Sequence, residues 1–119
     1  MVGFVLPYPP SLNRHYRFIG RRVLISYEGL AFRESVRSAL VAAGVKPMTG
    51  PLKVEIDLYP PDARVRDVDN GMKPLLDSLQ HARVFANDSQ IRRLEVEMCG
   101  IMPGGKALVR IDRYERRET

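Results

Sequence analysis

The sequence predicts one domain of the α/β (α+β) class, in which two main helices pack on a mixed β-sheet. The chain has 119 residues, enough for one domain with one hydrophobic core. Helix-like and strand-like segments are interspersed along it, which is typical of a sheet covered by helices. Hydrophobic residues make up 45% and charged residues 28%, as in an ordinary globular protein. We therefore expect residues 1–119 to fold as a single domain.

The N-terminal quarter predicts a strand, an extended turn and a hairpin. Residues 2–6 are a short apolar run, and the prolines of the following PYPPSLN end it and favour an extended turn over residues 7–13. Two further short segments, residues 16–19 and 22–25, flank Gly20 and resemble the arms of a hairpin. The chain is thus expected to begin with β-structure.

Two helices and a strong strand are predicted in the centre of the chain. Ser26 suits the N-cap of a helix over residues 27–43, and Gly44 suits its C-terminal end. Residues 52–59 alternate between apolar and polar side chains, which indicates a strand with one buried face. A second helix is expected over residues 70–82. The apolar stripes consist of Ala31, Val36, Ala39, Leu40 and Ala43 in the first helix and of Met72, Leu75, Leu76 and Leu79 in the second.

The C-terminal part predicts two strands joined by a turn. Apolar side chains alternate over residues 91–99 and again over residues 106–113. The intervening residues 102–105 contain the proline and glycines of a turn. We expect the two strands to pair as a hairpin, and residues 113–119 to form a solvated tail.

The charge balance favours a polyanion as partner. The formal net charge is +5 and the sequence pI is near 9.7. Of the 19 basic residues, 15 are arginine, whose planar guanidinium group donates paired hydrogen bonds to phosphate oxygens. Charge alone does not establish nucleic-acid binding, because many basic proteins bind no nucleic acid.

Several classes of protein are disfavoured. No apolar run approaches the roughly 20 residues of a membrane span, and the N-terminus lacks the basic region and long apolar core of a signal peptide. Cys99 is the single cysteine, so no intramolecular disulfide can form, and two histidines leave too few soft ligands for structural zinc. Neither glycine-rich nucleotide-binding pattern is present. We expect a cytoplasmic protein that binds no membrane and no nucleotide cofactor.

The stretch RVRDVDNGMKPLLD, residues 64–77, holds the strongest functional signal. If residues 67–69 are extended, the carboxylates of Asp67 and Asp69 point to the same side, where they repel each other unless a divalent cation lies between them. Asp88 follows in the loop FANDSQ, and a bend there can return it to the same edge of the sheet. Three converging carboxylates would suit Mg²⁺ or Mn²⁺.

A simpler interpretation of the two aspartates remains open at this point. Asp67 or Asp69 can cap the following helix, since aspartate is a preferred N-cap residue. Lys73 favours the functional interpretation, because it follows Asp69 by one helical turn and a positive charge there can stabilise a phosphate. Its alternative is an ion pair with Asp69 or Asp77, and we favour a structural role for Asp77. Asn70 can orient a carboxylate or simply begin the helix.

Two motifs together resemble the RusA family of Holliday-junction resolvases. The first is DVDNGMKPLLD at residues 67–77, followed by FANDSQI, and the second is LPYPPSLNRHYR near the N-terminus. The resemblance extends over nearly the whole chain in element order and length. It departs at Asn87, where some relatives have another acid, and at His15, which replaces an aromatic residue.

The resemblance implies a RusA-like, metal-dependent endodeoxyribonuclease that works as a homodimer and resolves four-way DNA junctions by paired symmetric nicks, in recombination and repair. It identifies Asp67, Asp69 and Asp88 as metal ligands and, together with Lys73, as catalytic residues. It implies Mg²⁺ as cofactor, with Mn²⁺ as a possible substitute. DNA contacts are expected from Asn13, Arg14, Tyr16, Arg64, Arg66 and Asn70. The alternatives are a catalytically silent nucleic-acid-binding module and a metal nuclease for other branched or flap DNA.

Overall fold

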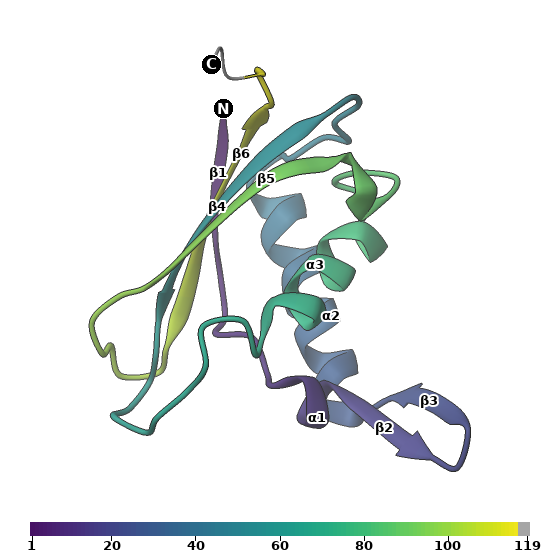
Figure 1. The fold of residues 1–119 in the computed structure, drawn as a ribbon, viewed down its shortest axis with the longest axis vertical. Helices are drawn as coiled ribbons and strands as arrows, with labels where there is room; N and C mark the ends of the chain where they lie inside the picture. Colours follow the sequence, from purple (N-terminus) through teal and green to yellow (C-terminus); the bar gives the residue numbers. More distant parts are fainter. Residues whose placement is uncertain (117–119) are drawn as a thin grey trace.

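The fold consists of a four-stranded mixed sheet with helices on one face, together with a separate two-stranded hairpin (Figure 1). The computed structural model describes residues 1–116. The elements in chain order are β1 Val2–Leu6, α1 Leu12–His15, β2 Tyr16–Ile19, β3 Arg22–Ile25, α2 Tyr27–Ala42, β4 Leu52–Tyr59, α3 Met72–His81, the 3₁₀ turn η1 Asp88–Gln90, β5 Ile91–Met98 and β6 Lys106–Arg113. This arrangement confirms the predicted α+β class.

Strand β4 lies inside the sheet and has a neighbour on each side. The strand order is β1-β6-β4-β5, and β4 runs parallel to β5 and antiparallel to β6. Its alternating pattern is confirmed: one face is buried and the other is half-buried. The buried side chains are those of Leu52, Val54, Ile56 and Leu58. Because the helices cover only this inner face, the outer face of the sheet is left open to solvent (Figure 1).

The expected hairpin between the last two strands is wrong. β5 and β6 do not pair with each other, because β4 lies between them. The helix α3 connects β4 to β5, and such a crossover returns the chain parallel to the first strand. The turn at residues 102–105 then carries the chain across β4, so that β6 pairs with β4 on its other edge.

Helix α2 begins where Ser26 caps it, as predicted. The Ser26 hydroxyl accepts a hydrogen bond of 2.9 Å from the Gly29 N–H, and Gly44 adopts a positive φ of 67° beyond the C-terminal end. The predicted apolar stripe is partly wrong, because Ala31 and Ala43 are exposed. The helix instead turns its bulkier apolar side chains to the sheet, which buries more apolar surface. The buried residues of α2 are Gly29, Phe32, Val36 and Leu40.

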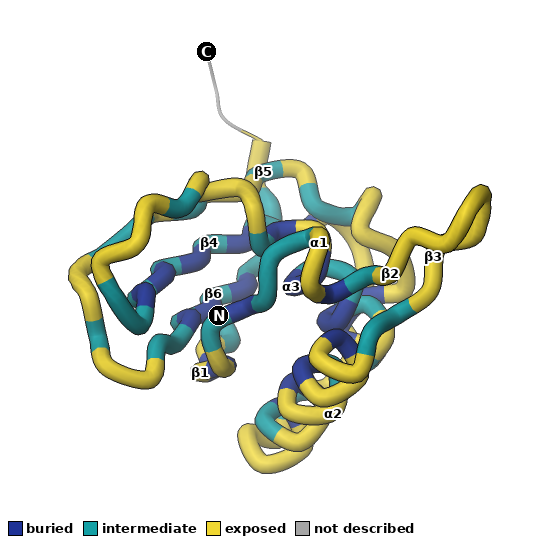
Figure 2. The backbone as a smooth tube through the Cα atoms, turned by 90° about the horizontal axis from the view of Figure 1, so that it is seen from below, coloured by how far each residue is buried: buried dark blue, intermediate teal, exposed yellow. Residues whose placement is uncertain are grey.

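Helix α3 packs beside α2 and completes the core. Its predicted apolar stripe is confirmed: Leu75 and Leu79 are fully buried and Leu76 is half-buried. Pro74 lies in the first turn, where the missing N–H has no helical partner to lose. Figure 2 shows the buried residues along β4, β6 and the facing sides of the two helices.

The extended turn expected over residues 7–13 is correct only for its first part. A short helix, α1, begins at Leu12, and the Ser11 carbonyl accepts hydrogen bonds from the N–H groups of Arg14 at 3.1 Å and His15 at 2.9 Å. A proline disfavours helical backbone in the residue before it, and no proline occurs between residues 11 and 46. A helical turn can therefore form directly after the last of these prolines, beginning at Leu12.

The C-terminal tail is ordered further than predicted. Arg113 ends β6, and the half-buried Tyr114 donates its N–H to the Pro51 carbonyl at 2.9 Å. Residues 117–119 of the expected solvated tail lie outside the described residues. Within residues 1–116, no helix has the length and apolarity that a bilayer crossing requires.

Gly29→Ala is expected to destabilise the fold by about 1–3 kcal/mol, the usual cost of overpacking. A Cβ atom at this position would overlap the His15 carbonyl and lie 2.7 Å from Cγ1 of Ile25, so the hairpin would have to move off α2. Urea denaturation of both variants measures the effect, with Gly100→Ala as control, because a Cβ atom at Gly100 meets open space. Equal stability of the two variants would contradict this explanation.

Candidate active site

The two motifs that are distant in sequence meet in space. The Leu12 N–H donates a hydrogen bond of 3.2 Å to the Asn70 carbonyl, which ties the N-terminal segment to the start of α3. Gly71 lies against Pro9, and a Cβ atom there would be 2.8 Å from Cγ of that proline. The glycine in DNGMK is therefore required for close packing of the N-terminal prolines on α3.

A groove of about 550 Å³ lies between these two segments and α2. Its walls come from the N-terminal prolines, from Tyr8 and from the loop that precedes α3. The predicted functional residues that line it are Arg14, Arg64, Arg66, Asp67 and Asn70. Asn13 is exposed on α1 and does not line the groove. Most of the predicted DNA contacts thus share one concave surface with one predicted metal ligand.

Asp62, which neither sequence motif contains, organises the two arginines of the groove. Its carboxylate lies 3.3 Å from Arg64 and 2.9 Å from Arg66. The Arg66 guanidinium also stands over the Tyr8 ring, 5.6 Å from its centroid. The hydrogen bond from the Arg64 N–H, followed by the two guanidinium groups, lowers the pKa of Asp62 below its usual value. In the sequence D-A-R-V-R, an acid and two arginines stand at alternate positions, and this spacing is the signal that indicates such ion pairs.

Asp67 and Asp69 lie in a turn that leads into α3, so the assumption of an extended segment is wrong. The Asp67 carbonyl accepts from the Asn70 N–H at 3.2 Å, and the Asp69 carbonyl accepts from the Met72 N–H at 3.1 Å. The capping interpretation is also wrong, because Gly71 is the N-cap residue and no side chain caps the helix. Both side chains are exposed.

The carboxylates of Asp67 and Asp69 have no partner among residues 1–116. The neighbouring cations pair with other acids: Arg64 and Arg66 pair with Asp62, and Lys73 pairs with Asp77. Exposed carboxylates that have no hydrogen bond or cation within the described residues are open to an external ligand of positive charge. Carboxylate oxygens are what Mg²⁺ prefers, and this ion usually retains several waters beside one or two protein carboxylates. The donors present therefore fit a hard divalent cation.

Asp88 lies at the opposite end of α3 from the other two aspartates. Its N–H donates a hydrogen bond of 3.0 Å to the side chain of Gln80 in the last turn of α3, whereas Asp69 precedes the first turn. A helix of 10 residues is about 15 Å long. The structure of one chain thus does not bring the three aspartates together, and a bend in the loop does not return Asp88 to the same edge.

Lys73 stands in the first turn of α3, on the exposed side. Its ammonium group lies 3.1 Å from the Asp77 carboxylate, and 64% of its side chain is exposed. The expected pairing of Asp77 with Lys73 is confirmed. A cation near a helix N-terminus is unfavourable for the helix, and this first turn contains no acid. The same position favours a bound phosphate, because the positive end of the helix dipole adds to the lysine charge.

Tyr16 does not point into the groove. Its hydroxyl donates to the Asp77 carboxylate, and burial, followed by this hydrogen bond, raises the pKa of Tyr16. The Lys73 ammonium lies 5.8 Å from the centroid of the Tyr16 ring. Tyr16 therefore belongs to the group of side chains that holds Lys73 and Asp77, and its expected role as a direct DNA contact gains no support from its position.

The free energy of unfolding is expected to fall as the pH drops below about 6.5, because His15 is buried as the neutral form. The ring is fully buried, neither nitrogen has a hydrogen-bond partner among the described residues, and burial, followed by the Arg33 charge, lowers its pKa. The unfolded chain therefore binds a proton that the folded chain does not. Urea denaturation between pH 5 and 8 should show a shallower pH dependence for His15→Phe and an unchanged one for His81→Gln, which alters an exposed histidine. An unchanged pH dependence for His15→Phe would contradict the explanation.

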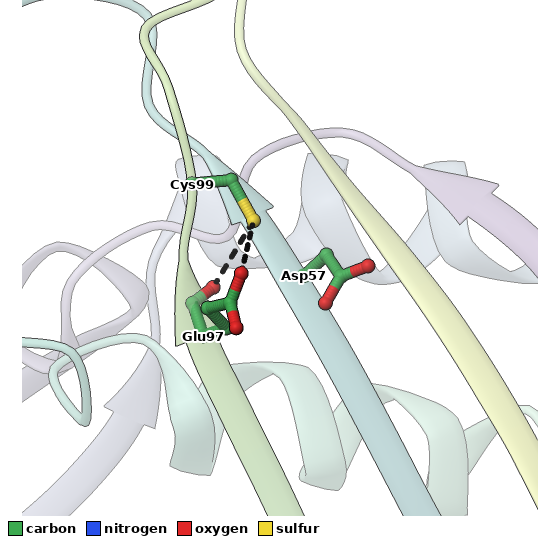
Figure 3. Close-up of side chains that lie close together, drawn as sticks. All are labelled: Asp57, Glu97 and Cys99. Carbon is green, nitrogen blue, oxygen red and sulfur yellow. Dashed lines mark hydrogen bonds between the residues drawn. The ribbon is translucent and has the colours of Figure 1, made fainter.

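A different cluster brings three potential metal ligands together on the open face of the sheet. Within residues 1–116, the ligand atoms of Asp57, Glu97 and Cys99 lie within 4.8 Å of one another (Figure 3). Asp57 is already paired with Arg110 at 3.0 Å, and the Cys99 thiol donates to Glu97. Burial, followed by the charges of Asp57 and Glu97, raises the pKa of Cys99, which keeps the thiol protonated. The three side chains are thus occupied by one another and by Arg110, and none of them lines the groove.

Comparisons with known proteins agree with the two motifs. The family of the endodeoxyribonuclease RusA matches residues 7–112. The crossover junction endodeoxyribonuclease rusA of Enterobacteria phage HK97 is 37% identical over 113 residues, which cover 94% of each chain. The crossover junction endodeoxyribonucleases RusA of Shigella sonnei (strain Ss046) and Escherichia coli (strain K12) are 36% and 35% identical over 108 residues, or 87% of this chain and 88% of theirs. The chain belongs to the RusA endodeoxyribonuclease family.

Proposed function

We propose that this protein is a Mg²⁺-dependent endodeoxyribonuclease that resolves four-way DNA junctions by paired symmetric nicks, in recombination and repair in the cytoplasm. Its family and the names of its relatives support this class of reaction. The observation that carries the assignment is the exposure of Asp67 and Asp69, which have no partner among residues 1–116, and the position of Asp67 in a groove bordered by arginines.

The basic side chains of the groove hold the DNA backbone in this proposal. Arg14, Arg64 and Arg66 contact phosphate oxygens and so set the position of the DNA without reading its sequence. Asp62 fixes two of these arginines before DNA arrives, which reduces the conformational entropy lost on binding. Lys73 places a positive charge at the N-terminus of α3, where it stabilises the negative charge that develops on the scissile phosphate.

Asp67 and Asp69 are the residues that would hold Mg²⁺, or Mn²⁺ in its place. The ion, when bound, supplies Lewis-acid chemistry for hydrolysis of a phosphodiester. Without a cation the two carboxylates repel the phosphate backbone, because like charges at short range raise the energy of the complex. The acids thus make cleavage conditional on the metal, while the arginines supply affinity.

The position of Asp88 supports a homodimer with shared sites. Asp88 and Asp69 flank opposite ends of the same helix, so two copies of α3 that run antiparallel about a twofold axis put Asp88 of one chain near Asp67 and Asp69 of the other. Such a dimer has two equivalent sites. Two sites are what a symmetric cut on opposed strands of a junction requires.

Cleavage of defined DNA substrates tests the proposed function. Purified protein with Mg²⁺ or Mn²⁺ is incubated with a four-way junction, a flap and a linear duplex of the same sequence. Paired symmetric nicks in the junction alone are the expected result. Binding of the junction without any cleavage would favour a silent binding module, and faster cleavage of the flap would favour a nuclease for other branched DNA.

A further inference from the structure

The hairpin formed by β2 and β3 projects from the body of the protein. Within the part of the chain that the structure describes, the two strands pair only with each other, in a sheet of their own. Figures 1 and 2 show the hairpin extending beyond the N-terminal end of α2, with its outer half exposed. An isolated two-stranded hairpin is marginally stable in water, so its base must be fixed to the body and its outer part is available to a partner.

The base of the hairpin is firmly attached. The Tyr16 hydroxyl donates to Asp77 of α3, and the Ser26 N–H donates to the His15 carbonyl at 2.9 Å. Gly29 allows α2 to approach the His15 backbone closely. The outer half has no such contacts, although it contains four exposed apolar residues. Their exposed fractions are 57% for Phe18, 51% for Ile19, 60% for Val23 and 40% for Leu24.

The register of the hairpin separates two faces. Phe18 is opposite Val23, and side chains directly opposite each other share a face, so this pair forms an exposed apolar patch that continues the face of Tyr16 and Ile25 away from the body. Arg17 is opposite Leu24, and Arg22 is opposite Ile19, so both arginines project from the other face. Arg21 adds a third positive charge at the connecting turn. The outer hairpin thus combines an aromatic tip with three arginines.

The charges identify the partner as a polyanion. The first 27 residues of the chain contain four arginines and no aspartate or glutamate. Among residues 1–116, the arginines at positions 17, 21 and 22 form no ion pair, whereas Arg37, Arg66 and Arg110 each pair with an acid. A second copy of this hairpin would bring like charges together. Phosphates of a nucleic acid neutralise them, and a two-stranded ribbon is narrow enough to enter a DNA groove.

We propose that the β2–β3 hairpin is an arm that enters the open centre of branched DNA, where its arginines contact phosphates and Phe18 rests on an unstacked base pair. This inference rests on the proposed function, because it assumes a DNA junction as substrate. At a branch point, the terminal base pair of each arm can lose its stacking neighbour, and an aromatic or apolar side chain replaces that neighbour. The arm then distinguishes a junction from a continuous duplex, which exposes no such surface.

Binding assays without divalent metal separate the two roles of the arm. Phe18→Ser is expected to weaken binding of a four-way junction by about 10- to 100-fold, the range of losses for a stacked base, and to leave duplex binding unchanged. A fluorescent purine analogue at the branch point should brighten with the wild-type protein, as unstacking requires, and not with Phe18→Ser. Val41→Ser is the matched control, since Val41 is exposed at the far end of α2.

The arginines are tested by the salt dependence of binding. Arg17→Gln and Arg22→Gln are each expected to weaken binding of both DNAs and to reduce the slope of log K against log salt by about 0.9. Lys46→Gln removes the same charge from an exposed site outside the hairpin and should leave the slope unchanged. A slope that is unchanged in the two arginine variants would overturn the phosphate contacts.

Two results would overturn the role of Phe18. One is a Phe18→Ser protein that binds the junction and unstacks the branch point as the wild type does. The other is a Phe18→Ser protein that changes from dimer to monomer in light scattering, because the apolar face would then be a subunit interface. If the wild-type protein itself does not bind a junction, the proposed function fails as well, so the two failures are distinguishable.

Discussion

Asp69→Asn is expected to reduce junction cleavage by at least about 10³-fold, comparable with the loss of a strong electrostatic group in an active site. It should leave junction binding intact or stronger, because a negative charge near the phosphate backbone is removed. The fold should be unaffected, since the Asp69 carboxylate is exposed and makes no hydrogen bond or ion pair with residues 1–116. Single-turnover cleavage and gel-shift titration with the same junction measure the two effects.

Asp112→Asn is the matched control for this substitution. Asp112 lies in β6, on the face of the sheet that the helices do not cover, and pairs with the N-terminal amine at 3.6 Å. Loss of that contact should leave the cleavage rate unchanged. A normal cleavage rate for Asp69→Asn would show that the active site has been assigned to the wrong residues.

Lys73→Ala is expected to slow cleavage by about 10²- to 10³-fold, because a charge that stabilises the transition state is lost. Its stability should change by less than about 0.5 kcal/mol, since an exposed ion pair along a helix contributes little. Rapid mixing of protein and junction at saturating Mg²⁺ gives the rate, and urea denaturation gives the stability. The two measurements together separate catalysis from folding.

The cleavage rates of two further variants serve as controls for Lys73→Ala. Lys46→Ala removes an exposed lysine that does not line the groove, so its cleavage rate should equal that of the wild type. Asp77→Asn removes the ion-pair partner of Lys73 and should reduce the rate far less than loss of the lysine. If Lys73→Ala cuts at the normal rate, Lys73 is only a structural partner of Asp77.

Most secondary structure was predictable from local pattern. The alternation in residues 52–59 and the cap at Ser26 each depend on a few neighbouring residues, and the structure confirms both. The partner of each strand was not predictable in this way. The failure of the expected β5–β6 hairpin reflects a non-local choice, because either edge of β4 can accept a strand and only the crossover through α3 decides which one does.

The residue types of the site were predictable, but their geometry was not. The acids of DVDN stood out because adjacent carboxylates repel, and the turn that holds them depends on packing of Gly71 against Pro9, a contact between segments far apart in sequence. The role of Asp62 is only weakly indicated by the sequence, because the spacing of D-A-R-V-R permits its two ion pairs but is common on protein surfaces. The separation of Asp88 from Asp69 follows from the length of α3, which the helical pattern already indicated.

A mixed dimer of Asp69→Asn and Asp88→Asn chains tests the central claim most directly. The two variants carry different affinity tags, are coexpressed, and the mixed dimer is purified over both tags. If each site combines Asp69 of one chain with Asp88 of the other, one site of the mixed dimer is intact and the other carries both substitutions. The mixed dimer is then expected to nick one strand of the junction, while both homodimers are inactive. A mixed dimer as inactive as the homodimers would contradict the shared site.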